Sequence, residues 1–130
     1  MVRHFVELPY IFSILLYIMR NITKESIEAF ELGIKYKRSN TEVKVFPNGM
    51  RELWLHGSII ARADGNHFEN LHITNAGFFT NTTKERLNGF PMVQINQKDF
   101  EWYLNGSKWS GNYTQISHNR IEWLISEGLY

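Results

Sequence analysis

The segment of this chain with the clearest chemical potential is rich in threonine and carries two cations. Residues 80–89 read TNTTKERLNG. A helix beginning here would present free backbone N–H groups and the positive end of its dipole, around which hydroxyl, ammonium and guanidinium groups could hold a phosphate. A simpler structural role is also open, in which Thr82 caps the helix and Lys84 and Arg86 are solvated. The candidate contacts are Thr80, Thr82, Thr83, Lys84, Arg86 and Asn88.

An aromatic segment offers a second kind of contact. Residues 97–109 read QKDFEWYLNGSKW, and aromatic residues interleaved with lysines can stack bases and hold a nucleic-acid backbone. Strand alternation would place Phe100, Trp102 and Leu104 on one face, which we expect to be core. The residues left for binding are Lys98, Tyr103 and Lys108, with Trp109 as a further stacking candidate.

A tryptophan in an outward-facing row suggests a protein contact. Glu52, Trp54 and His56 alternate with leucines in a predicted strand, and a Trp on a polar face is a candidate hot spot. If helices cover both faces of the sheet, Trp54 is core instead. Trp54 and His56 are therefore candidate protein contacts, and the position of Trp54 stays open.

No segment carries a metal-binding or catalytic signature. The absence of cysteine excludes a disulfide framework, a thiolate nucleophile and a Cys-based zinc site. His56, His67 and His72 would bind zinc only if folding brought enough ligands into tetrahedral geometry. No nucleophile elbow surrounds a serine. We expect no metal, no cofactor and no catalytic residue, and binding is favoured over catalysis.

Composition narrows the class of protein. The chain has 130 residues, which is enough for one domain with a real core. Its formal net charge of +1 excludes a strongly basic nucleic-acid wrapper and a strongly acidic nucleic-acid mimic. The lack of cysteine fits a reducing compartment.

The N-terminal segment is unusual because it is apolar. Residues 8–19 read LPYIFSILLYIM and carry no charge, but they are too few to cross a membrane as a helix. Three interpretations are open: a buried helix or strand, a membrane-associated anchor, or a start of the protein at Met19. We therefore treat residues 1–19 as an apolar segment apart from a single working domain of residues 20–130.

The spacing of apolar residues predicts the elements that must position these candidates. Thr23 can cap a first helix, with Ile27, Phe30 and Ile34 on one face, and residues 35–40 are expected to be a loop. Period-two patterns joined by turn signals predict an antiparallel meander. Its strands are expected around residues 43–45, 53–55, 59–62, 71–73, 93–95 and 100–104.

Two further helices complete the predicted fold. A short one covers residues 82–89, with capping-box spacing between Thr82 and Glu85, and a last one opens at Asn119. The expected fold class is α+β: a meander of about six or seven strands, a short helix after the fourth strand, and helices near both termini.

Four motifs resemble those of a family of small uncharacterised bacteriophage proteins. They are LHG followed by IA at residues 55–61, TNAGF at 74–78, TNTTKERLNG at 80–89 and QKDFEWYLNG at 97–106. The resemblance covers residues 22–109, and residues 82–88 are its most specific part. It implies a phage origin, and with it action in the host cytoplasm.

Two binding functions follow from these observations. The leading hypothesis is a non-enzymatic phage accessory protein that binds a host macromolecule, for example as an inhibitor of a host or defence protein. The alternative is a nucleic-acid-binding module that uses the threonine-rich helix start and the aromatic hairpin. The oligomeric state is left open.

Overall fold

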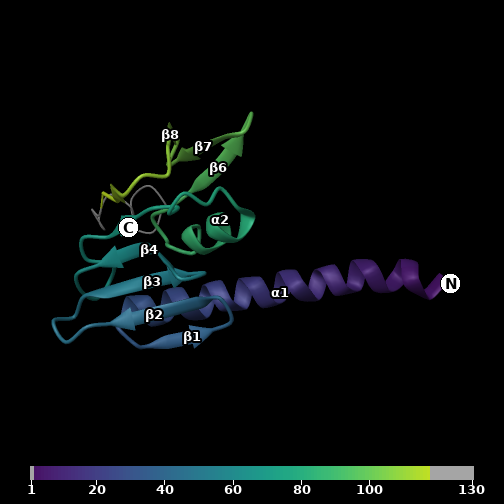
Figure 1. The fold of residues 1–130 in the computed structure, drawn as a ribbon, viewed down its shortest axis with the longest axis horizontal. Coiled ribbons are helices and arrows are strands. Elements are labelled where there is room, and N and C mark those ends of the chain that lie inside the picture. The colour runs from purple at the N-terminus through teal and green to yellow at the C-terminus, as the bar shows by residue number, and fades with distance from the viewer. Residues whose placement is uncertain (1, 118–130) are drawn as a thin grey trace, which may run out of the picture.

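Two antiparallel sheets and two helices make up the part of the chain that the structure describes, residues 2–117 of a computed structural model (Figure 1). The larger sheet has the order β1-β2-β3-β4-β5-β9 and the smaller one β6-β7-β8. The α+β class and the antiparallel meander are confirmed, and the predicted helix from Asn119 lies outside the described residues. The elements are α1 (Val2–Leu32), β1 (Tyr36–Arg38), β2 (Thr41–Val45), β3 (Arg51–Leu55), β4 (Ser58–Ala63), β5 (His72–Ile73), α2 (Asn81–Leu87), β6 (Ile95–Lys98), β7 (Glu101–Leu104), β8 (Ser107–Lys108) and β9 (Thr114–Gln115).

Two-residue turns with glycine set the register of two hairpins. His56 and Gly57 have φ of 50° and 79°, and Asn105 and Gly106 have φ of 49° and 88°. Positive φ at both loop positions is typical of a type I′ turn, and glycine adopts it without strain. The first turn lies one residue earlier than expected, because the paired part of β3 ends at Leu55. His56 therefore lies in a turn and not in the outward row of β3.

Two further local expectations are corrected. Residues 35–40 contain the short strand β1, which pairs with β2, so the larger sheet gains an edge strand. The helix α2 is capped by Thr80 and not by Thr82, because the Thr80 Oγ1 accepts the Thr83 N–H at 3.2 Å. Thr82 instead lies within the first turn of the helix.

The helix α1 begins well before its predicted start at Thr23. Thr23 lies buried inside the helix, so it is not the N-cap. The helix ends before Gly33, whose φ is 72°, as a C-terminal glycine predicts. The Arg51 Nη1 of β3 donates to the last carbonyls of α1, at 2.9 Å to Phe30 and 2.8 Å to Glu31. This cation stabilises the negative end of the helix dipole.

The first half of α1 extends past both sheets (Figure 1). Ile11, Ile14, Leu15, Tyr17 and Ile18 are between 37% and 67% exposed. Of the three interpretations of this segment, that of a buried helix or strand is therefore right about a helix and wrong about the burial of these residues. No helix in the described range 2–117 is long and apolar enough to span a membrane.

The second half of α1 packs on the inner face of the larger sheet. Phe30 of α1 contacts Phe68 and Phe90, and the three ring centroids are 5.2 to 6.2 Å apart. Such edge-to-face and stacked contacts add to the energy of burial. The buried residues around these rings include Ile27, Val43, Leu53, Leu55, Ile60, Ala61, Ile73 and Leu87.

A buried arginine joins three elements. Arg86 of α2 is 1% exposed. Its Nε donates to the Thr41 Oγ1 of β2 at 3.0 Å, and its Nη1 donates to the Thr23 Oγ1 and the Met19 carbonyl of α1 at 2.6 and 3.2 Å. Burial lowers the pKa of Arg86, against the attraction of the Glu85 carboxylate. The expectation that Arg86 is solvated is therefore wrong.

We predict that Arg86→Ala lowers the free energy of unfolding by about 2–4 kcal/mol, because buried hydroxyls lose a charged partner. Arg62→Ala, at an exposed position of β4, is the control and should stay within about 0.5 kcal/mol. Urea unfolding measures both. Equal losses in the two variants would contradict the role assigned to Arg86.

A second prediction concerns alkaline pH. The Tyr36 Oη donates to the Glu25 Oε1 at 2.9 Å, and burial, followed by this hydrogen bond, raises the pKa of Tyr36 to about 12. The folded chain keeps the phenol proton to a higher pH than the unfolded chain, so the stability that this group gives below about pH 10 is lost as the pH rises to about 12. Thermal unfolding across this range should show a smaller loss in Tyr36→Phe than in the wild type. Identical pH profiles would contradict this prediction.

Candidate functional site

The threonine-rich start of α2 uses its hydroxyls for the helix itself. The Thr80 Oγ1 accepts the Thr83 N–H and lies 2.9 Å from the Thr83 Oγ1, and Thr83 is buried. The helix has seven residues. The arrangement is a local cap, which satisfies the first free N–H groups of the helix.

The other polar residues of this segment attach α2 to the smaller sheet. The Lys84 Nζ donates to the Gln97 Oε1 at 3.1 Å and lies 5.9 Å from the centre of the Trp102 ring. Asn88 makes two hydrogen bonds with Ile95: its Nδ2 donates to the carbonyl and its Oδ1 accepts the N–H. Both side chains therefore position β6 and β7 relative to α2.

The candidate cations are divided between the two faces of the smaller sheet. Gln97 pairs with Trp102 across β6 and β7, so Lys84 lies against the face that these two residues share. Tyr103 and Lys108 pair with each other, and alternation places both on the opposite face, together with Lys98. Since the interior also encloses Arg86, the structure does not bring the predicted phosphate contacts together.

Trp54 lies on the outer face of the larger sheet and is half-buried. The Lys44 Nζ lies 3.9 Å from the centre of its ring, and its Nε1 donates to the Glu52 Oε1 at 3.1 Å. Trp54 is thus surface and not core. His56 lies apart from it, in a pocket of about 120 Å³ that Phe78, Thr80 and Thr82 also line.

The three candidate histidines do not converge. The His72 ring stacks on Tyr113 at 4.8 Å between centroids, and the His67 Nδ1 lies 3.4 Å from the Glu31 Oε1. Among residues 2–117, no group of three acidic or histidine side chains is placed to hold a metal ion. We therefore base no function on these histidines.

Phe100 is another residue that the sequence pattern placed wrongly. It was expected to be core, but it is 96% exposed, whereas Trp102 and Leu104 are buried as predicted. The reason is that Lys98 pairs with Glu101, which leaves Asp99 and Phe100 as the two-residue loop of the hairpin. The sequence did carry one signal for this turn, which is Asp99, because Asp is favoured at the first position of a two-residue hairpin loop.

The backbone of this loop is strained. Asp99 and Phe100 have φ of 52° and 65°. At the second of these loop positions, where this hairpin has Phe100, the other two hairpins have Gly57 and Gly106. A bulky residue there costs about 1 kcal/mol. Phe68 has the same conformation, with φ of 60°, but it is buried in the aromatic core, which offsets the strain. No burial offsets it for Phe100.

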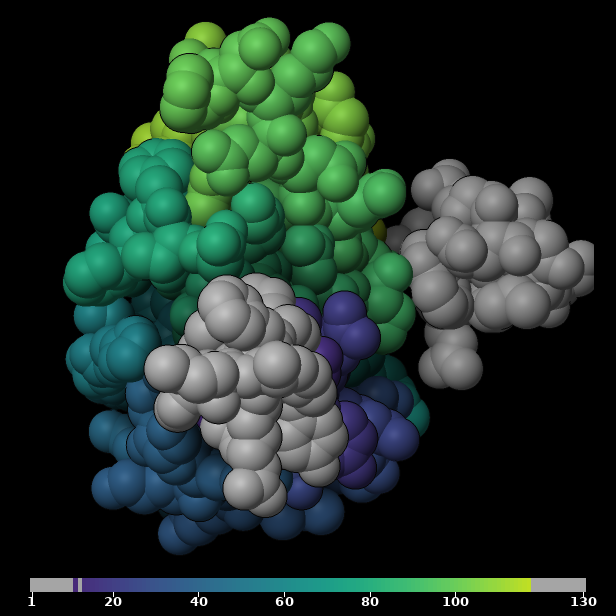
Figure 2. Space-filling view, turned by 90° about the vertical axis from the view of Figure 1, so that its right-hand side faces the viewer, coloured from purple at the N-terminus to yellow at the C-terminus, as the bar shows by residue number. Residues whose placement is uncertain are grey.

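Another exposed ring contacts this hairpin. Phe79, which precedes α2, is 57% exposed and contacts the Trp102 ring edge to face at 5.1 Å. Figure 2 shows the smaller sheet, in light green, at the end of the molecule opposite β1 and β2. We define the hairpin tip as residues 98–101, and it is the candidate contact site.

We predict that Phe100→Gly raises the free energy of unfolding by about 1 kcal/mol, because glycine relieves the positive-φ strain. Phe100→Ala removes the ring but keeps the strain, so it should change the stability by no more than about 0.5 kcal/mol. Guanidinium unfolding measures both. A stabilisation of equal size in the two variants would assign the effect to the exposed ring and not to the backbone.

Comparison with known proteins places the chain in a family. A family model described as Kyanoviridae Gp96 protein matches residues 19–125, which include both sheets, α2 and the hairpin tip. No curated protein and no solved structure matches the chain. The resemblance to small phage proteins is confirmed at the level of the family. The chain belongs to the Kyanoviridae Gp96 protein family, a family of phage proteins.

Proposed function

We propose that this phage protein acts by binding a protein of the host cell, and that the hairpin tip makes the principal contact. One observation carries the proposal: Phe100 is almost fully exposed in a strained backbone conformation. The strain makes the free protein less stable and the exposed ring adds no stability in return, and strained residues that persist in a fold are often kept for function. A partner that encloses the ring would recover the energy of its exposure.

The residues next to Phe100 fit a contact site of small area for another protein. Lys98, Asp99 and Glu101 place charges of both signs around the ring. In protein interfaces an aromatic anchor in an apolar pocket typically provides most of the energy, while a polar rim excludes water. The partner is therefore expected to offer an apolar pocket with a polar rim. Figure 1 shows that the β6–β7 hairpin projects from the body of the protein, where it is accessible.

The nucleic-acid alternative has less support. Arg86 is enclosed, and Lys84 donates to Gln97 on the face of the smaller sheet opposite Tyr103. On the other face, the Lys108 Nζ lies 3.5 Å from the Glu101 carboxylate. A phosphate backbone binds best to a continuous row of cations, which these residues do not form. We therefore do not propose this role.

The test begins with a lysate of the cells that the phage infects. The wild-type chain is immobilised, a protein retained in stoichiometric amount is identified, and its purified form is titrated by calorimetry. Phe100→Gly should weaken its binding about 30-fold, equivalent to the loss of a hot spot of about 2 kcal/mol. Because the same change is expected to stabilise the fold, weaker binding would not reflect unfolding.

Tyr113→Ala is the matched control. Tyr113 is an exposed aromatic residue that stacks on His72 of the larger sheet, away from the hairpin. It should bind the partner within about threefold of the wild type. The proposal fails if no stoichiometric partner is retained, or if Phe100→Gly binds as tightly as the control.

A further inference from the structure

The larger sheet has an open edge beside β2. β1 pairs with β2 only as far as Tyr36 and Val43. Before Tyr36 the chain turns toward α1, where the Ile34 N–H donates to a helix carbonyl at 2.9 Å. Lys44 and Val45 therefore have no neighbouring strand on this side among the described residues. An open edge is a template for a further strand.

The backbone groups that face this edge belong to Val45. The Phe46 N–H donates to the Met50 carbonyl at 2.8 Å, and the Gly49 N–H donates to the Phe46 carbonyl at 2.9 Å. Both backbone groups of Phe46 thus point toward β3. Successive residues of an antiparallel strand direct these groups to opposite sides, so the N–H and C=O of Val45 point outward.

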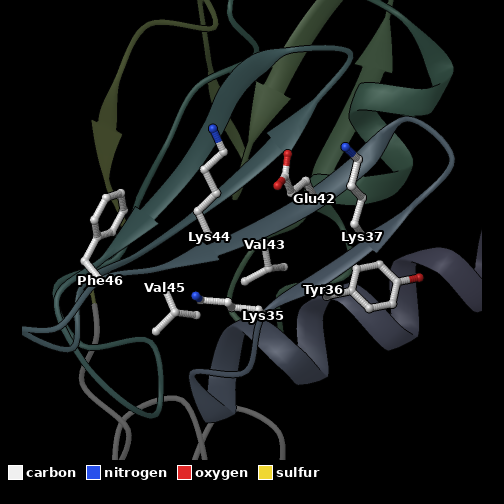
Figure 3. A pocket seen from close by; sticks show the side chains of 8 residues that line it. All are labelled: Lys35, Tyr36, Lys37, Glu42, Val43, Lys44, Val45 and Phe46. Carbon is white, nitrogen blue, oxygen red and sulfur yellow. The ribbon is translucent and has the colours of Figure 1, made fainter.

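A groove of about 460 Å³ lies along the open edge (Figure 3). Tyr36, Val45 and Phe46 supply partly buried apolar walls. The groove runs beside the strand backbone, so a bound segment could make main-chain hydrogen bonds and side-chain contacts at once. Binding by strand addition depends on this combination.

Lysines give the groove a positive charge. Figure 3 shows Lys37 and Lys44 on the same side of the sheet as Glu42, whereas Lys35 extends toward Val45. The lining of the groove therefore carries three ammonium groups and one carboxylate. In the part of the chain that the structure describes, Lys35 and Lys37 have no hydrogen-bond or ion-pair partner, and Lys44 rests on the Trp54 ring.

We infer that this groove, defined by the open edge of β2 and the three lysines, binds an extended acidic peptide segment of a partner protein as an added strand. The backbone of Val45 provides one donor and one acceptor for the ladder, the apolar walls take up alternate side chains, and the lysines select carboxylates. This site lies on the larger sheet and is independent of the hairpin tip.

A peptide fits these features better than a nucleic acid. Both carry negative charge, but only a peptide brings backbone N–H and C=O groups in the spacing of a strand. A phosphate backbone offers no donor for the Val45 carbonyl. The positive charge of the lysines attracts both classes of ligand, whereas the backbone hydrogen bonds to Val45 favour a peptide.

The test uses three fluorescent probes with the full-length chain. The first is a blocked octapeptide in which glutamate alternates with valine, the second is the same peptide with N-methyl groups on alternate backbone nitrogens, and the third replaces glutamate by lysine. We expect saturable binding of the first at concentrations below about 1 mM, and binding at least about tenfold weaker for the other two.

Variants locate the site. Val45→Pro removes the outward N–H and is tolerated at an edge position, and it should weaken binding of the acidic peptide about tenfold. The double variant Lys35→Glu with Lys37→Glu should also weaken binding of the acidic peptide about tenfold, because it replaces two positive charges in the groove by negative ones. The control is Lys98→Glu with Lys108→Glu, which makes the same change of net charge on the smaller sheet and should leave binding within about threefold.

Several results would overturn this inference. Among them are no saturable binding of the acidic peptide, and equal binding of its N-methylated form. A loss of binding in the Lys98 and Lys108 control as large as in the Lys35 and Lys37 variant would show that net charge alone attracts the probe. A single-stranded oligothymidylate is a further probe. If it bound more tightly than the acidic peptide, and if Val45→Pro did not weaken its binding, the groove would be assigned to nucleic acid.

Discussion

The guanidinium of Arg86 holds together the three elements on which the rest of the fold is arranged. A buried cation is costly unless its donors are paired, so the oxygens of Thr41, Thr23 and Met19 must be in place together. Those oxygens come from β2 and α1, while the arginine comes from α2. The packing of α2 on α1 and the sheet is therefore strongly specified. Arg51 plays a comparable part at the end of α1, where it binds the last helix carbonyls.

The position of α2 determines that of the smaller sheet. Asn88 binds both backbone groups of Ile95, and Lys84 binds Gln97, so β6 is attached to the helix by polar contacts as well as by buried residues. The β6–β7 hairpin is thereby directed away from the larger sheet (Figure 1). These hydrogen bonds hold the strand that leads to the tip, and for the contact that we propose such preorganisation reduces the entropy lost on binding.

Phe68 and Phe100 carry the same backbone strain, but only one of the two residues is compensated by burial. Both have positive φ, but Phe68 is enclosed by other rings, whereas Phe100 faces solvent. Burial explains the first, and the fold offers no energetic reason for the second. The open edge of β2 is a separate feature, created because the chain leaves the sheet before Tyr36 to join α1. Two surfaces at opposite ends of the molecule thus offer contacts of different chemistry, one through an aromatic anchor and one through a backbone ladder.

Local patterns were enough to predict the class of fold and its meander, because period-two alternation and glycine turns depend on near neighbours. They also indicated the buried faces of Phe30, Trp102 and Leu104. They could not show that Arg86 is enclosed or that Phe100 is exposed. The first depends on oxygens from residues more than forty positions away, and the second on a one-residue choice of hairpin register. Only the tertiary structure decided these points, because burial and register are set by contacts between segments distant in the chain.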